Sequence, residues 1–502
     1  MKEIKILLLY PPEQSWPDAM VKPNGSLAYP YLGGALRDIG IETYIYDACV
    51  GNSDDNLDNF FNKTEKLPSG MIKTGVSNER VLEIASSYNA IGITSIFSQQ
   101  ETQVLNCAKL IKKHYPNKLL FSGGVNAKSR SSFFFNAGFD IICTSESEST
   151  IQQIVKILQK GSRDFSSVGK IYYKNESGKI IDNSYFGDVI RDLDKLPIPA
   201  WDLLPNERYW KIGRPSGGRV APGKLKYVSM MTSRGCPFSC SYYHIAEEVE
   251  NSKSGAIGRF RIKSDERVGH ELQILKDDIG AKQIFIMDDS IFGMKRRAIR
   301  LLKSIADYGL NLMDVNGINT IHLLKKSNKP GWLVPDEEVI ELLAEVGFTE
   351  IVLPFESVNP RIIKKWCSNK LALDHFSPED LIKTIKKYNL YVGSNYMIGF
   401  PDETREEIET TVKFAYRMVQ NGFDHANFFL LMPVPGTPMF DYCIAKGHLS
   451  PDYNPDNFQW TKTNLLNTAV PAAELEKIRD KAWNDCNTER FKKIRRSWLA
   501  AN

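Results

Sequence analysis

The sequence predicts an α/β protein with two main domains, a doubly wound parallel sheet followed by a partial β/α barrel. Its 502 residues exceed what one ordinary hydrophobic core encloses. Short apolar runs alternate with amphipathic helical stretches along most of the chain, which is typical of parallel sheets covered by helices. Between about 161 and 222 this alternation stops at a hairpin pattern and a proline-rich stretch, which indicates a boundary.

The first domain is expected over residues 1–160. Its predicted strands are 4–10, 42–47, 90–95, 118–122 and 140–143, and its predicted helices are 31–39, 78–88, 102–114 and 148–159. In such sheets ligands bind at the carboxyl ends of the strands. Three polar loops follow strands there, namely Ser98-Gln99-Gln100, Ser122-Gly123-Gly124-Val125-Asn126 and Thr144-Ser145-Glu146-Ser147-Glu148. A glycine pair lets backbone approach a large ligand, although a glycine pair after a strand is more often a simple turn.

The linker is expected over residues 161–222, with a hairpin at 168–181 and a stiff proline-rich connector at 196–205. The barrel is expected over residues 223–450. Its predicted strands are 226–231, 283–287, a short one near 314–318, 350–355, 391–400 and 425–431, and its predicted helices are 264–278, 295–308, 336–345, 378–388 and 405–421. Polar residues follow several of these strands, which predicts a site at that face of the barrel. Residues 451–502 are expected to form a helical cap over the site.

The composition predicts a cytoplasmic globular protein. The net charge of +4 is small for this length and gives no reason to invoke nucleic acid, and the basic stretch 490–496 is interpreted as a solvated helix face. No run approaches the ~20 apolar residues of a membrane span. The sequence enters a strand pattern directly after Met1, without a signal peptide. Eight scattered cysteines are typical of free thiols in a reducing compartment.

The most informative stretch is the loop 233–244, which directly follows the first predicted barrel strand. Cys236 and Cys240 stand four residues apart in it, within a segment that contains glycine and proline. Without a secretion signal, such a pair indicates metal or cluster ligation before it indicates a disulfide. Thiolates select iron–sulfur clusters, zinc or copper(I).

This loop resembles that of radical S-adenosylmethionine (SAM) enzymes, which carry Cys-x3-Cys-x2-Cys after the first strand of a β/α barrel. Cys236 and Cys240 match the first two cysteines, and Tyr243 stands where the third is expected. The flanking Arg234-Gly235, Pro237-Phe238 and Tyr242 also match. Later strand ends resemble family landmarks in the right order, at Glu356-Ser357, Asn395, Gly399-Phe400-Pro401 and 433–438. The resemblance implies SAM binding by Phe238, Tyr242, Glu356, Ser357, Asn395, Gly399 and Pro401.

The first domain resembles the cobalamin-binding domain that precedes many radical SAM barrels, and the segment 196–205 resembles the family's connector. The resemblance implies cobalamin contacts at Ser98, Gln99, Gly123, Gly124, Val125, Ser145 and Glu146. No histidine precedes His114, which ends a predicted helix, so we expect cobalamin to bind without a histidine on cobalt. The surrounding pocket would then set the redox behaviour and the methyl affinity of the cobalt.

The family's chemistry implies a [4Fe-4S] cluster that chelates SAM and, once reduced by an external donor such as a flavodoxin or ferredoxin, cleaves it to a 5′-deoxyadenosyl radical. Together with cobalamin this implies methyl transfer to an unactivated carbon or phosphorus of a small-molecule substrate. One alternative is a cobalamin-dependent radical cyclase without methyl transfer. Another is a cluster-deficient protein that binds cobalamin and SAM with non-radical or no catalysis.

Tyr243 leaves the state of the cluster open, because a phenol is a hard oxygen donor. In one interpretation the third ligand comes from elsewhere, from Tyr243 or His244; in a second the cluster is lost; in a third the tyrosine is a deleterious or deliberate substitution in an otherwise ordinary enzyme. From the motif alone we expect a labile cluster, substoichiometric iron and poor SAM cleavage, with both restored by Tyr243→Cys.

Overall fold

The computed structural model divides into two compact units, which we describe one at a time. The first comprises residues 1–226 and 248–261, and the second comprises 227–247 and 262–502. The structure describes residues 3–17, 19–23, 25–185, 189–215, 226–248, 256–368, 370, 373–489 and 491–493. The end of the expected linker and the end of the expected C-terminal segment therefore lie outside the described residues.

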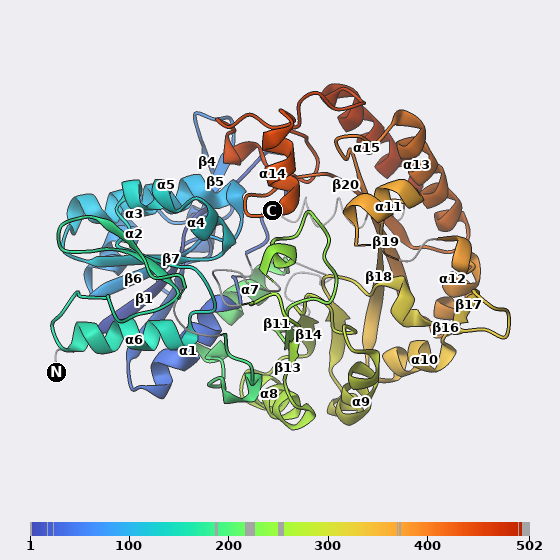
Figure 1. Cartoon of the computed structure of the whole chain (residues 1–502). Coiled ribbons are helices and arrows are strands. Elements are labelled where there is room, and N and C mark those ends of the chain that lie inside the picture. Colours follow the sequence, from blue (N-terminus) through green and yellow to red (C-terminus); the bar gives the residue numbers. More distant parts are fainter. Residues whose placement is uncertain are drawn as a thin grey trace. The chain divides into compact units, whose positions relative to one another are not determined.

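The first unit is built on a mostly parallel seven-stranded sheet (Figure 1). Its strands are β1 (Lys5–Tyr10), β3 (Glu42–Asp47), β6 (Ala90–Thr94), β7 (Leu119–Gly123), β8 (Ile141–Cys143), β9 (Ile171–Lys174) and β10 (Ile180–Asp182), in the order β10-β9-β8-β7-β6-β1-β3. The five neighbouring strands β3, β1, β6, β7 and β8 pair in parallel. The β9–β10 hairpin, which the sequence analysis assigned to the linker, pairs antiparallel with β8 and so extends this sheet. A small sheet of β2 (Glu13–Ser15), β4 (Glu65–Lys66) and β5 (Ile72–Thr74) was not expected.

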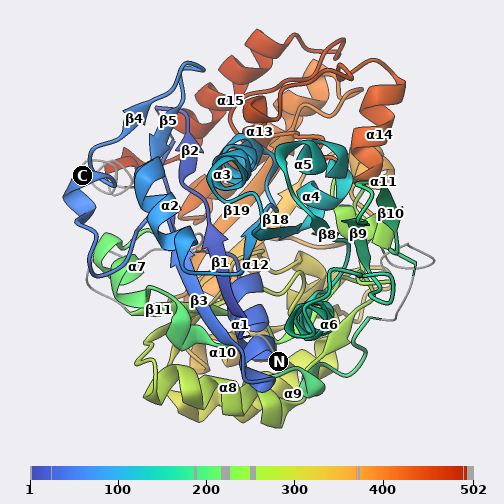
Figure 2. The same cartoon turned by 90° about the vertical axis from the view of Figure 1, so that its left-hand side faces the viewer.

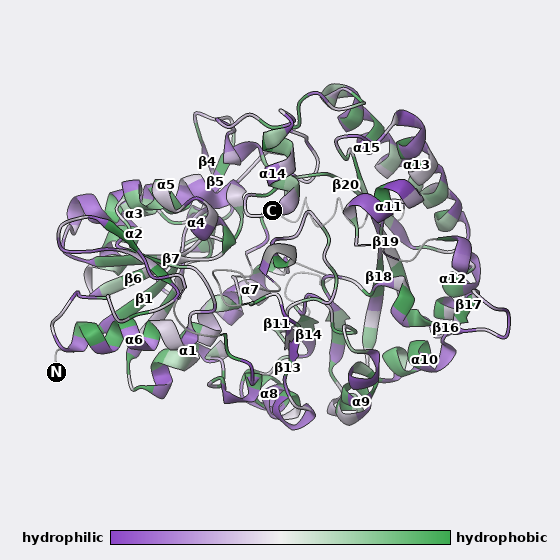
Figure 3. Ribbon diagram, in the orientation of Figure 1, coloured by the Kyte–Doolittle hydropathy of each residue, from purple (hydrophilic) through white to green (hydrophobic). Residues whose placement is uncertain are grey.

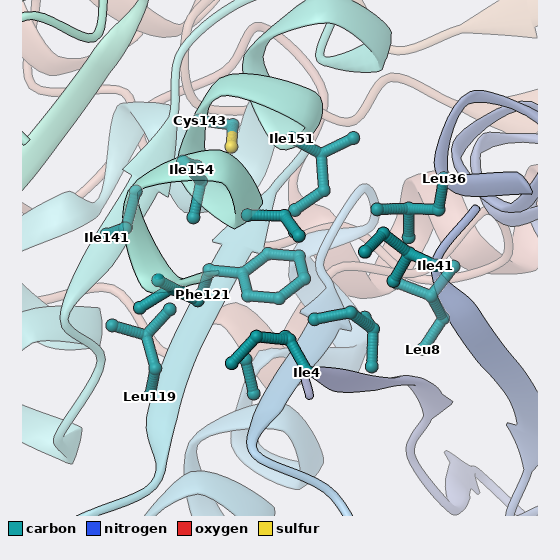
Figure 4. Close-up of a cluster of buried hydrophobic side chains, with 14 of the residues drawn as sticks. Ile4, Leu8, Leu36, Ile41, Leu119, Phe121, Ile141, Cys143, Ile151 and Ile154 are labelled. Atoms are coloured by element: carbon teal, nitrogen blue, oxygen red, sulfur yellow. The ribbon is translucent and has the colours of Figure 1, made fainter. Parts of the chain in front are cut away.

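Helices cover both faces of this sheet, as the strand–helix alternation predicted (Figure 2). The helices are α1 (Ala28–Asp38), α2 (Asn78–Ser86), α3 (Glu101–His114), α4 (Val125–Ser129), α5 (Ser131–Ala137), α6 (Glu148–Gln159) and α7 (Asn206–Ile212). Because successive side chains of a strand point to opposite faces, β1 serves two cores. Leu8 packs with α1 and α6, as Figure 4 shows, whereas Leu7 packs with α2, α3 and α5.

The second unit contains a six-stranded parallel sheet whose strands follow one another in chain order. They are β11 (Tyr227–Met230), β14 (Gln283–Ile286), β15 (Asn311–Asp314), β18 (Phe348–Glu356), β19 (Tyr391–Ile398) and β20 (His425–Leu430). All five neighbouring pairs are parallel. The helices that connect them are α8 (Asp265–Asp277), α9 (Lys295–Ile305), α10 (Glu337–Glu345), α11 (Pro360–Trp366), α12 (Pro378–Lys387) and α13 (Arg405–Gln420), with the β16 (Leu324–Lys326)–β17 (Leu333–Pro335) hairpin before α10. This arrangement confirms the predicted partial β/α barrel.

The third barrel strand differs from the prediction in position. It was expected near 314–318, but β15 ends at Asp314. There the Asp314 carboxylate accepts a hydrogen bond from the backbone N–H of Asn316, and Gly317 follows with a φ of +85°. A side chain that bonds the backbone two residues on, followed by a left-handed glycine, makes a turn and ends the strand.

The C-terminal segment covers the edge strand β20 of the barrel sheet. Helix α15 (Ala472–Cys486) packs against β20 and α13. Helix α14 (Pro438–Ala445) lies between β20 and α15 in the chain. The Asn487 side chain donates to the Ala426 carbonyl and accepts from the Ala426 N–H, while Arg479 donates to the Phe428 carbonyl. These bonds satisfy backbone groups that an open sheet edge leaves unpaired.

Polarity follows the same layering. Figure 3 shows hydrophobic residues concentrated in β1 and β6, and hydrophilic residues frequent on helices such as α8 and α13. Within the described part of the chain, no helix is both long enough and apolar enough to cross a membrane.

Candidate active site

The cysteine loop lies at the carboxyl end of β11 and is held there by its neighbours in the barrel sheet. The backbone N–H of Gly235 donates to Asp289, which follows β14, over 3.2 Å. Cys236 is partly buried and Cys240 is buried, and both are free thiols. Burial raises the pKa of Cys236 to about 11 and also raises that of Cys240. The nearby Lys370 ammonium lowers both pKa values but does not outweigh burial, so without a bound metal these sulfurs remain thiols.

The two tyrosines after the cysteines have different surroundings. Tyr242 is buried, and its ring lies 6.2 Å from that of Phe400, edge to face. Tyr243 keeps 48% of its surface exposed, and its backbone N–H closes a turn onto the Cys240 carbonyl. For the cluster that the resemblance implies, the two thiols fit, but a phenol at 243 does not fit the preference of cluster iron for sulfur. The ligand set of the motif is therefore incomplete.

Glu356 ends β18 beside this loop and is held in an unusual backbone conformation. Its φ of +62° lies in the left-handed region, which costs a residue with a side chain on the order of 1 kcal/mol or more. Its carboxylate pairs with Lys370 over 2.7 Å, and both side chains are largely buried. Burial lowers the pKa of Lys370, but the Glu356 carboxylate and neighbouring thiols outweigh it, so the pKa is raised. Lys370 is therefore a charged ammonium at the site.

Sequence reasoning did not identify Lys370, because it lies in no strand and matches no motif. It also did not assign roles to three carboxyls at the ends of β14 and β15, which are those of Asp288, Asp289 and Asp314. Asp288 accepts hydrogen bonds from Thr232 and Ser233, each of 2.6 Å. Burial, followed by the charge of Asp288, raises the pKa of Asp289 to about 6 and also raises that of Asp314 well above its usual value. The position of these three aspartates at strand ends was the sequence feature that could have identified them as site residues.

Most of the remaining predicted SAM residues contact other side chains or backbone groups of the fold. The Ser357 hydroxyl accepts a bond from the Asn359 N–H, and Asn395 accepts one from Asn427 on β20. Phe238 packs edge to face against His322 at 6.0 Å, and Pro401 is buried. The structure thus brings Cys236, Cys240, Tyr242, Tyr243 and Glu356 to one place, whereas Ser357 and Asn395 already bind partners within the fold.

Gly399 has a structural role that the motif did not reveal. Its φ is +85°, and a Cβ added there would lie 2.3 Å from a methyl group of Leu475 on α15. The N–H groups of Gly399 and Phe400 both donate to the Glu403 carboxylate. Burial raises the pKa of Glu403 to about 8, against the effect of these two bonds. The N–H of Gly399 is therefore used within the loop itself.

In the first unit, the predicted cobalamin loops lie at the carboxyl ends of β6, β7 and β8. The sheet order reverses between β1 and β6, and such a switch point is where doubly wound sheets bind ligands. Ser98 donates to Asn126, and the Gln99 carbonyl accepts a bond from Gln14. Gly123 ends β7, and Val125 begins α4. These bonds fix the shape of the loops at this edge.

Gly124 and Glu146 each have a structural role within this unit. Gly124 has a φ of +100°, and a Cβ there would lie 2.4 Å from the Ser95 carbonyl oxygen, so the glycine is required by the packing of two loops. The Glu146 carboxylate makes two bonds to the guanidinium of Arg261, over 2.9 and 2.6 Å. Ser145 precedes it, and its carbonyl accepts a bond from Ser147.

His114 is at the wrong edge of the sheet to serve a ligand there. It is the last residue of α3, and helices that connect parallel strands run antiparallel to them. The end of α3 therefore lies at the amino edge of the strands, opposite the loops after β6 and β7. The His114 ring nitrogen Nδ1 is 3.0 Å from the Leu110 carbonyl of its own helix.

The barrel sheet runs in chain order, with a cysteine loop after its first strand and a carboxylate that ends its fourth. Residues 230–415, which contain these features, match the model of the Radical SAM superfamily.

The similarity to individual proteins extends over nearly the whole chain. An uncharacterized methyltransferase of Pyrococcus horikoshii is 29% identical over 459 residues, covering 89% of this chain and 85% of the relative. Cytidylyl-2-hydroxyethylphosphonate methyltransferase of Streptomyces wedmorensis is 23% identical over 477 residues, covering 89% and 83%. The fold resembles that of the radical SAM methyltransferase TsrM from Kitasatospora setae, solved with cobalamin and a [4Fe-4S] cluster, with a TM-score of 0.62 at 16% identity, covering 89% and 78%.

Proposed function

We propose that the protein is a cobalamin-dependent radical SAM methyltransferase that acts on a carbon or phosphorus centre of a small molecule. The observation that carries the proposal is the sequence similarity, over 89% of the chain and so across both units, to two proteins named as methyltransferases. A match to the barrel alone would support SAM chemistry, but the first unit adds a sheet suited to a large cofactor.

The first unit is the proposed cobalamin-binding unit. The loops around Ser98, Gly123-Gly124 and Glu146 lie at one sheet edge and are ordered by bonds within the unit. Their contribution is a preshaped surface, which lowers the ordering cost of binding a large ligand. Bound cobalamin supplies a methyl carrier. Because His114 lies at the opposite edge, the chain offers no histidine to the cobalt from the described residues of this unit.

The second unit is the proposed SAM-binding unit. We assign Glu356 to the hydroxyls of the SAM ribose, since a carboxylate accepts such bonds strongly. In the described structure this carboxylate pairs with Lys370 through one oxygen, Oε1. Its second oxygen gives it capacity for a further acceptor role. The strained backbone of Glu356 supports a functional assignment, since strain of this kind clusters at ligand sites.

Two further features complete the proposal. We propose an external one-electron donor such as a flavodoxin or ferredoxin, because radical SAM chemistry begins with a reduction. All eight cysteines are free, which supports a reducing compartment.

The test is a turnover experiment with SAM that carries a labelled methyl group. The protein, purified without oxygen and supplied with cobalamin and a reductant, is incubated with this SAM, and the products are separated by mass spectrometry. A methyltransferase releases S-adenosylhomocysteine as the label leaves SAM. Ring formation without methyl transfer would give no S-adenosylhomocysteine, and a non-catalytic binding protein would leave SAM intact. Either result overturns the proposal.

A further inference from the structure

The motif of this site lacks the third thiolate that a [4Fe-4S] cluster of this family requires. The motif supplies Cys236 and Cys240, and the position of the third cysteine holds the half-exposed Tyr243. No group of three histidine, cysteine, aspartate or glutamate residues among those described is placed to hold a single metal ion. A [4Fe-4S] cluster makes a different demand, because each thiolate binds a separate iron.

A second segment of the barrel runs directly along the cysteine loop. The N–H and hydroxyl of Ser241 both donate to the Trp366 carbonyl, over 3.0 Å each. The Ser239 N–H donates to the Ser368 hydroxyl over 2.9 Å. The residue between Trp366 and Ser368 is Cys367. These bonds therefore fix a third cysteine against the loop that carries Cys236 and Cys240.

One cation interacts with all three thiols. The Lys370 ammonium acts electrostatically on the thiols of Cys236, Cys240 and Cys367. Cys240 and Cys367 also belong to the same buried cluster of side chains. The three sulfurs therefore lie around one side chain of the site, as three ligands of a single cluster must.

A buried donor points to the same place. The Tyr242 phenol lies beside the thiols of both Cys240 and Cys367. Its hydroxyl is buried and is placed to donate a hydrogen bond to either sulfur. A charged acceptor makes a stronger hydrogen bond than a neutral one, so this donor suits thiolate sulfurs at both positions.

We propose that Cys367 supplies the third thiolate of an iron–sulfur cluster in this chain, together with Cys236 and Cys240. On ligation each thiol gives its proton to solvent, and its thiolate replaces a weaker ligand on iron, with no electron exchanged. This inference rests on the proposed function, since only a cluster-dependent enzyme requires the ligand. It departs from the motif-based expectation that the unaltered chain holds iron only partially.

The test measures iron and acid-labile sulfide per chain in anaerobically purified full-length protein, together with the electron paramagnetic resonance of the reduced sample. The unaltered protein should hold about four irons. Cys367→Ala should lose most of this iron, and Tyr243→Cys combined with Cys367→Ala should regain it. Cys443→Ala is the matched control, because Cys443 is equally buried in the same side-chain cluster, and it should retain the iron.

The outcomes separate this inference from the proposed function. Full iron in Cys367→Ala overturns the inference alone, as does an iron-poor unaltered protein beside a loaded Tyr243→Cys. If neither the unaltered protein nor Tyr243→Cys takes up iron, the proposed function fails, and the inference fails with it. Recovery in the double variant also shows that the fold tolerates Cys367→Ala. If Cys367→Ala misfolds both alone and combined with Tyr243→Cys, the iron content of Cys367→Ser decides in the same way.

Discussion

Lys370 and Glu356 form a buried ion pair, with 2.7 Å between Lys370 Nζ and Glu356 Oε1. Glu356 ends a barrel strand, whereas Lys370 follows a helix and belongs to no regular element. The pair ties the loop after α11 to the carboxyl end of β18, next to the cysteine loop. It gives the site one fixed positive charge.

Replacing Lys370 with Met should destabilise the protein by about 3 kcal/mol, because it leaves the Glu356 carboxylate buried without its partner. Glu356→Gln combined with Lys370→Met should recover part of this loss, since neither residue is then charged. Urea unfolding of the protein without cofactors measures both. Equal stability of the two variants would show that the ion pair is not the source of the loss.

Glu356→Ala should weaken SAM binding by about 1–3 kcal/mol, if the carboxylate bonds the ribose hydroxyls. Titration calorimetry of the folded variant measures the affinity. Glu474→Ala serves as the control, because Glu474 is a more exposed carboxylate paired with Arg405. Unchanged affinity in Glu356→Ala would refute the assignment of this residue.

Gly124→Ala should destabilise the protein even without cobalamin. The new Cβ would overlap the Ser95 carbonyl, which belongs to the backbone and has little freedom to move. Gly40→Ala is the matched control, since Gly40 also has a positive φ, of +70°, but has nothing within 4 Å of an added Cβ. The control should cost about 1–2 kcal/mol and Gly124→Ala about 1–3 kcal/mol more. If Gly124 serves the ligand alone, thermal unfolding will show equal losses.

Glu403 should make stability depend on pH. Its pKa is raised from 4.5 to about 8 in the folded protein, mainly by burial. Between these values the folded state keeps a proton that the unfolded state has lost, so stability falls as the pH rises. Glu403→Gln removes this dependence. Its free energy of unfolding relative to the unaltered protein should therefore rise by a few kcal/mol from about pH 5 to about pH 8. A constant difference across that range would contradict the raised pKa.

Cobalamin bound to the protein should show no nitrogen from a histidine on its cobalt. His114 lies at the amino edge of the first sheet, so His114→Ala should leave the spectrum unchanged. Electron paramagnetic resonance of the cob(II)alamin form detects an axial nitrogen through its extra splitting. A splitting that disappears in His114→Ala would mean that this histidine reaches the ligand.

The sequence by itself determined the architecture, because hydrophobic periodicity is a local property of the chain. The predicted strand 42–47 and the predicted helix 148–159 coincide with β3 and α6. The doubly wound sheet and the partial barrel follow from the alternation of such elements. Cys236, Cys240 and Glu356 were singled out because each stands at a recognisable strand end and matches a motif of the family that the sequence resembles.

Only the tertiary structure decided which groups meet at the site. Lys370 reaches Glu356, and Arg261 reaches Glu146 across 115 positions of the chain, and no local pattern marks either pair. Cys367 lies beside the cysteine loop because backbone and serine hydrogen bonds join two segments more than a hundred residues apart. Buried charges and thiols must find partners wherever the fold brings them together, and that depends on long-range packing.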